Sequence, residues 1–172
     1  DSFPRDAAAY RTMADIYNLL YVEIVGSPVW DLQQFIPDVV IIELGTNDFS
    51  TGPEPEEGDT ETVYPRSGPA VQDYADAYIA FVEELLTAWP DAHVFAVSSP
   101  MLGDNWPTAE DTRAQDLKDA LALVEAHFTS GQVHAVIVSK QTGRGCGTHP
   151  DVAQGQETAV EVEAAIRTAM GW

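Results

Sequence analysis

The chain has 172 residues, and 45% of them are hydrophobic, so it is long enough to bury a core and apolar enough to fold. Its 28 acidic residues far outnumber its 8 basic residues and give a formal net charge of −20 at pH 7. Such a charge repels nucleic-acid phosphates and anionic lipids, so neither is an expected partner. The acidity by itself is typical of a solvated surface and identifies no ligand.

Other features of the whole sequence argue against a disulfide-bonded, a membrane-spanning or a metal-binding protein. A single cysteine, Cys146, excludes an internal disulfide. No stretch approaches the roughly 18 apolar residues of a membrane span, and residues 1–6 have neither the basic start nor the apolar run of a signal peptide. The histidines lack the spacing of metal ligands, so we expect no metal and no other cofactor. No linker divides the sequence, so residues 1–172 are expected to form one domain.

The apolar residues of the N-terminal segment have no clear spacing, and the first clear pattern along the sequence is that of a strand. Residues 10–23 are compatible with a helix followed by a loop, and residues 28–36 predict a short helical turn that ends before Pro37. Residues 39–44 then form a β-branched apolar run that ends at Gly45. Such a run is typical of a strand that is buried on both faces of a parallel sheet.

The rest of the sequence alternates helices and strands. Residues 52–68 are rich in proline, glycine and acids and predict a surface loop. The apolar spacing predicts helices over residues 70–88, 109–128 and 152–170, and strands over residues 93–97 and 133–138. This alternation predicts an α/β protein with a mainly parallel sheet. Functional residues of such proteins follow the carboxyl ends of the strands, which directs attention to residues 45–50, 98–106 and 141–149.

The turn from Gly45 to Asp48 directly follows the strongest strand. A glycine there allows a sharp turn and lets a substrate approach the backbone closely. The amide of Asn47 can donate a hydrogen bond to a developing oxyanion. The same residue types are also the commonest in an ordinary strand-ending turn, so both interpretations stay open for this segment alone.

His149 lies in a glycine-rich loop after the third predicted strand, directly before Pro150, which is well placed in the first turn of the last helix. A histidine is the usual general base at neutral pH. The alternative is a structural histidine that is bonded to the backbone at a helix entry. We interpret the other three histidines as structural, because two begin strands at the far end of the sheet and one lies late in a helix: His93, His134 and His127.

Taken together, the two loops resemble conserved blocks of the SGNH (GDSL-type) hydrolases. Leu44 to Ser50 resembles the third block, and Cys146 to Pro150 resembles the fifth. Within this superfamily the chain is similar to carbohydrate esterase family 2, the acetylxylan esterase-like enzymes, from about residue 11 to residue 172. Short matching segments carry this similarity: Arg11-Thr12-Met13, Trp30-Asp31, Pro37 to Val40, Gly45 to Ser50, Ser99 to Leu102, and Gly145-Cys146 before His149-Pro150.

The resemblance implies a three-layer α/β/α sandwich and a secreted esterase that removes acetyl groups from plant polysaccharides without a cofactor. It assigns Asn47 to the oxyanion hole, with Gly45 supporting its turn, and makes His149 the base that activates a serine. Phe49, Met101 and Trp106 are candidates for the wall of the acyl or sugar pocket, with core packing as the alternative for each.

Two departures from the family pattern matter. The nucleophilic Gly-Asp-Ser block is missing, because Asp1-Ser2 lacks the glycine and has no strand before it. We therefore expect the first strand and the serine to lie upstream of Asp1, the chain to assemble with such an N-terminal segment, and the chain to be inactive alone. The second departure is Cys146, which stands where most of the superfamily places an aspartate that orients the histidine; some members of this esterase family use a backbone carbonyl instead.

Other interpretations remain compatible with the sequence. One is an SGNH esterase or lipase of different specificity, and a second is an inactive remnant that only binds carbohydrate. A third is a proteolytic fragment without a function of its own.

Overall fold

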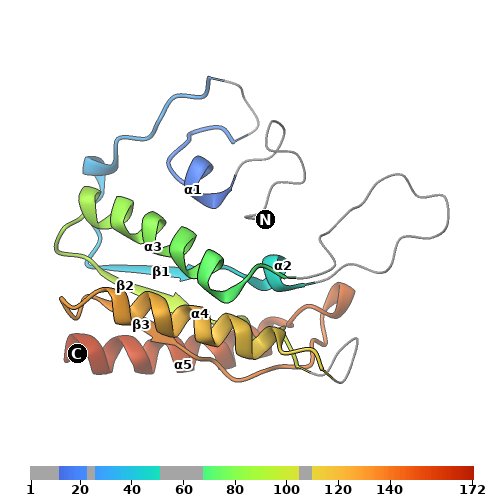
Figure 1. Cartoon of the computed structure of the whole chain (residues 1–172). Coiled ribbons are helices and arrows are strands. Elements are labelled where there is room, and N and C mark those ends of the chain that lie inside the picture. The colour runs from blue at the N-terminus through green and yellow to red at the C-terminus, as the bar shows by residue number, and fades with distance from the viewer. Residues whose placement is uncertain (1–11, 23–25, 51–67, 105–109) are drawn as a thin grey trace.

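A computed structural model describes residues 12–22, 26–50, 68–104 and 110–172 (Figure 1). Most of the predicted loop over residues 52–68, and Trp106, lie outside the described residues. Within these described residues, three parallel strands form a sheet in the order β1-β2-β3. They are β1 (Val39–Glu43), β2 (His93–Val97) and β3 (Val133–Val136). The predicted parallel sheet is therefore confirmed.

Helices cover both faces of this sheet and make the predicted three layers (Figure 1). The helices α3 (Val71–Ala88) and α4 (Arg113–His127) lie side by side on one face, where they pack on the strand residues Ile42, Val94 and Ala96. The helix α5 (Val152–Met170) lies on the other face. Its apolar side chains pack on Phe95 and other residues of β2 and β3.

The amphipathic spacing explains why α3 forms where it does. Its buried side chains recur every three or four residues: Tyr74, Tyr78, Phe81, Val82 and Leu85. Burying a large apolar side chain of this kind contributes roughly 1.5–3 kcal/mol relative to leaving it exposed. Packing on the sheet therefore supplies most of the stability of this helix, as is usual for helices in proteins.

Two element ends differ from the prediction for local reasons. The strand β3 ends at Val136 rather than Val138, because the Val138 N–H donates to the side-chain Oγ of Ser98 (3.0 Å) instead of to a backbone carbonyl. The helix α4 begins at Arg113 rather than near residue 109. Both differences occur at the carboxyl edge of the sheet, where side chains replace regular backbone pairing.

The described part of the N-terminal segment has the helix, the loop and the helical turn that the sequence predicts. It contains the short helix α1 (Met13–Ile16), a bridge between Leu19 and Val29, and a 3-10 turn over Leu32–Gln34. The helix stops because the chain folds back, and the Leu20 N–H donates to the carbonyl of Pro28 (3.0 Å). The segment packs on the outside of α3 (Figure 1).

The strand β1 lies at the edge of the described sheet, with β2 on one side only. Its residue Ile41 is 54% exposed. An apolar strand with a free edge is a surface that another strand can pair with.

Candidate active site

Hydrogen bonds tie the ends of the three strands into one edge. The hydroxyl oxygens of Thr46, after β1, and Ser99, after β2, are 2.7 Å apart. The Gln141 N–H, after β3, donates to the carbonyl of Pro100 (2.8 Å). The loops that carry Asn47 and His149 therefore lie at the same edge of the sheet, as the sequence predicts.

Gly45 has the left-handed backbone that a glycine favours, with φ of 106°, and it begins the one-turn helix α2 (Thr46–Phe49). This conformation explains the sharp turn after β1 and presents Asn47 at the surface. A Cβ atom at Gly45 would lie 2.6 Å from Leu117 Cδ1 and 2.8 Å from Tyr74 Oη. In the direction of a side chain, the space beside Gly45 is therefore filled by the core, and the close approach of a substrate to its backbone stays a prediction.

Backbone carbonyls orient the exposed ring of His149. Its Nδ1 lies 3.1 Å from the carbonyl oxygens of both Cys146 and Gly147. Because a carbonyl oxygen only accepts hydrogen bonds, Nδ1 carries the proton of the neutral ring, and the lone pair of that neutral ring is on Nε2. That tautomer is the one that a general base requires. The residue three positions before His149 thus contributes its backbone, so a cysteine side chain can stand there.

Asp151 does not take the orienting role. Its Oδ1 accepts from the Gln154 N–H (2.9 Å) and caps α5, and Arg144 forms an ion pair with it at 3.0 Å. The hydrogen bond from the Gln154 backbone lowers the pKa of Asp151. It is therefore a structural carboxylate.

Gln154, which the sequence reasoning missed, holds the histidine loop. It is 5% exposed, its Nε2 donates to the Thr142 carbonyl (2.8 Å), and its Oε1 accepts from the Arg144 N–H (3.0 Å). The sequence does contain a signal for it, because Asp151 and Gln154 have the spacing of a capping box.

The three residues that are candidates for the wall of a substrate pocket differ in their burial and position. Phe49 is 1% exposed and packs edge-to-face on Tyr74, with ring centroids 5.0 Å apart, so the structure shows core packing for it. Met101 is half-buried in the loop after β2. Trp106 lies outside the described residues.

The other histidines contact one another or helix residues, away from this edge. His93 Nδ1 and His134 Nε2 are 3.0 Å apart at the start of their strands, and His127 Nε2 is 3.3 Å from Glu83. Burial lowers the pKa of His134. Over the ranges that the structure describes, no three side chains are grouped to hold a metal ion, and no helix is long and apolar enough to cross a membrane.

Asp104 fixes the loop after β2 against α4. Its Oδ1 accepts from the backbone N–H groups of Ala114 (2.9 Å) and Gln115 (3.1 Å), as an N-cap residue does, although it lies ten residues away.

We expect Asp104→Ala to lower the free energy of unfolding by about 1 kcal/mol, because two N–H groups at the start of α4 lose their acceptor. Urea denaturation measures the change. Asp119→Ala, on the same helix, should stay within about 0.5 kcal/mol. Equal losses in the two variants would contradict the capping role.

A parallel sheet with helices on both faces, an oriented histidine and an exposed asparagine at its carboxyl edge has the architecture of an SGNH-type hydrolase. The model of the GDSL-like lipase/acylhydrolase family matches residues 21–170. The chain belongs to this family.

Proteins similar to this chain are carbohydrate esterases. The cellulase/esterase CelE of Acetivibrio thermocellus is 30% identical over 148 residues, which are 83% of this chain and 16% of that protein. The acetylxylan esterase/glucomannan deacetylase of Cellvibrio japonicus is 24% identical over 160 residues, 93% of this chain and 38% of that protein. A solved carbohydrate esterase family 2 enzyme from Corynascus thermopiles has a TM-score of 0.79 and 29% identity, covering 95% of this chain and 46% of that one. The chain thus spans less than half the length of each.

Proposed function

We propose that this chain supplies the base and part of the oxyanion hole of a carbohydrate O-acetyl esterase. The observation that carries the proposal is the pair of backbone carbonyls that hold His149 with Nε2 free, at the edge that also presents Asn47. The names of the similar proteins support a carbohydrate ester as the substrate class. Because such polysaccharides lie outside cells, the proposal includes secretion.

In the proposed reaction a serine attacks the acetyl carbonyl while His149 Nε2 takes its proton. The histidine then returns this proton to the sugar oxygen as the ester bond breaks, which leaves an acetyl-serine. Water then attacks that intermediate while His149 takes a proton from it, and this proton passes to the serine oxygen as its bond to the acetyl group breaks and acetate leaves. Asn47 donates to the carbonyl oxygen while it carries negative charge.

The serine is proposed to come from an upstream strand that bears a Gly-Asp-Ser block and pairs with β1. The free edge of β1 supports this arrangement, because a parallel neighbour there would end at the same edge as Asn47 and His149. Ile41 supports it too, because this exposed apolar side chain would be covered by the added segment. Intact-mass spectrometry of the purified protein distinguishes a segment that is continuous with the chain from one that is a separate polypeptide.

Asn47→Ala in the intact protein should lower kcat about a hundredfold and leave KM nearly unchanged, because the amide acts mainly as the oxyanion forms. Steady-state hydrolysis of p-nitrophenyl acetate measures both constants. Asn18→Ala, in the N-terminal segment, is the matched control and should retain full activity. A change confined to KM would count against the oxyanion role.

Acetyl specificity is tested by comparing substrates. The intact protein should release acetate from acetylated xylan and act on p-nitrophenyl acetate far better than on long-chain p-nitrophenyl esters. The opposite preference would favour an esterase or lipase of other specificity. Binding of the polysaccharide without hydrolysis would favour an inactive carbohydrate-binding protein.

A further inference from the structure

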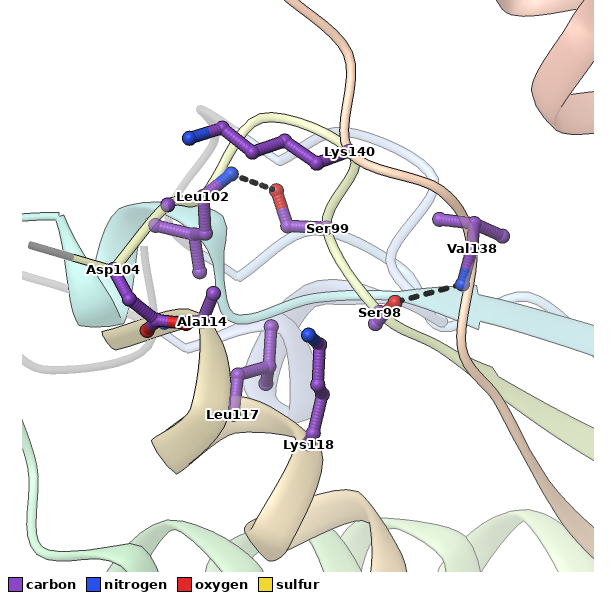
Figure 2. A pocket seen from close by; sticks show the side chains of 10 residues that line it. Ser98, Ser99, Leu102, Asp104, Ala114, Leu117, Lys118, Val138 and Lys140 are labelled. Carbon is purple, nitrogen blue, oxygen red and sulfur yellow. Dashed lines mark hydrogen bonds between the residues drawn. The ribbon is translucent and has the colours of Figure 1, made fainter. Parts of the chain in front are cut away.

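A small pocket of about 80 Å³ lies beside the candidate active site, between the loop after β2, the first turns of α4 and the chain after β3 (Figure 2). It lies well below the roughly 300–1,000 Å³ of pockets that enclose a drug-sized ligand. The pocket therefore suits a small chemical group rather than a whole sugar ring. Its polar lining consists of Ser98, Ser99, Asp104, Lys118 and Lys140.

Both lysines of the sequence line this pocket: Lys118 from α4 and Lys140 from the segment after β3. Figure 2 shows Lys118 extending from the helix toward Ser98, while Lys140 crosses above Leu102. Within the described parts of the chain, neither ammonium group takes part in an ion pair or hydrogen bond. In a chain with a net charge of −20, the only two lysines of the sequence thus line the same pocket, and neither has a partner among the described residues.

The charged side chains that line the pocket have a net positive charge, which one negative charge would balance. Asp104 is the only carboxylate among the lining residues, and its Oδ1 is already engaged by two N–H groups of α4. Two ammonium groups and one carboxylate sum to a local charge of +1. A monoanion balances that charge, whereas a phosphate dianion exceeds it.

Hydrogen bonds to Ser99 hold the loop that forms one wall of the pocket, and the Lys140 side chain lies close to that loop. Ser99 Oγ accepts from the Met101 and Leu102 N–H groups (3.1 and 3.3 Å). Lys140 lies directly over Gly103, where even a single added Cβ atom would overlap its Nζ. Because Ser99 also contacts Thr46, next to Asn47, the pocket adjoins the candidate active site.

We propose that this pocket binds a carboxylate group through Lys118 and Lys140. Two sources share that chemistry: a uronic-acid side group on the polysaccharide, and the acetate that hydrolysis releases. The acetate source rests on the proposed esterase function, whereas binding of a uronic acid needs no hydrolysis. Measuring binding in the His149→Ala background therefore separates this proposal from the esterase proposal.

The test is a titration of the intact protein, followed by NMR of ¹³C-dimethylated lysines that are assigned with Lys118→Arg and Lys140→Arg. The probes are sodium acetate and methyl glucuronoside, with acetamide and methyl glucoside as neutral controls and sodium chloride to hold the ionic strength. Both lysine signals should shift in a saturable way with a carboxylate and stay unmoved by the neutral probes. Lys118→Met and Lys140→Met should each weaken binding at least about tenfold, because each removes a hydrogen bond between charged groups.

Two further variants separate the position of the lysines from the overall charge of the protein. Arg167→Met removes a positive charge on the exposed face of α5 and should leave affinity unchanged, whereas Gly103→Ala should weaken binding by displacing Lys140 without removing charge. Saturation by only one carboxylate supports the site and identifies its source, and saturation by both supports a site that recognises the carboxylate group itself. Absence of saturable carboxylate binding, or an affinity in either lysine-to-methionine variant equal to that of the unsubstituted protein, would overturn the proposal.

Discussion

His149→Ala in the intact protein should lower kcat for p-nitrophenyl acetate by at least about a thousandfold, with little change in stability. The loss is large because the imidazole acts in both halves of the proposed reaction, first toward the serine and then toward water. Stability should hold because the ring is exposed and its hydrogen bonds reach only carbonyls of its own loop.

The matched control for this variant is His127→Ala, which removes an exposed histidine late in α4 that is 3.3 Å from Glu83. It should keep full activity. Thermal unfolding of both variants checks that the fold is retained. Activity near that of the unsubstituted protein in His149→Ala would show that another group is the base.

Gly45→Ala should lower the free energy of unfolding by about 2–4 kcal/mol and remove most of the activity. Two costs add: the left-handed backbone, with φ of 106°, disfavours a side chain, and the new Cβ would lie 2.6 Å from Leu117 Cδ1. Relieving that overlap shifts the turn that presents Asn47. Urea denaturation gives the stability change, and p-nitrophenyl acetate hydrolysis gives the activity.

Gly131→Ala separates the two costs. Gly131 also has positive φ, 76°, but a Cβ there would meet nothing within 4 Å. Only the backbone cost of about 1 kcal/mol should appear, with normal activity. If the two glycine variants are destabilised equally, the packing of Gly45 against Leu117 has no energetic role.

The sheet and its large helices could be predicted from the sequence because burial leaves a clear pattern. The β-branched run over residues 39–44 and the apolar spacing in α3 both reflect where side chains meet the core. Element ends were less predictable, since they depend on partners distant in sequence. The start of α4 is capped by Asp104, and the end of β3 is set by a bond to Ser98.

The sequence indicates the residue types of the candidate site but not its geometry. Asn47 and His149 stand out as polar residues after strands, yet the orientation of His149 depends on the direction of two carbonyls, one of them from Gly147 with φ of 60°. No side-chain pattern specifies that direction. Phe49 illustrates the converse problem, because an aromatic residue after a strand fits a pocket wall and a core equally well.

The most direct test of the central claim is labelling of the intact protein with a fluorophosphonate, followed by peptide mass spectrometry. We expect one adduct, on the serine of a Gly-Asp-Ser block upstream of residue 1, and loss of that adduct in His149→Ala. An adduct on a serine within these 172 residues, or labelling that persists without His149, would contradict it.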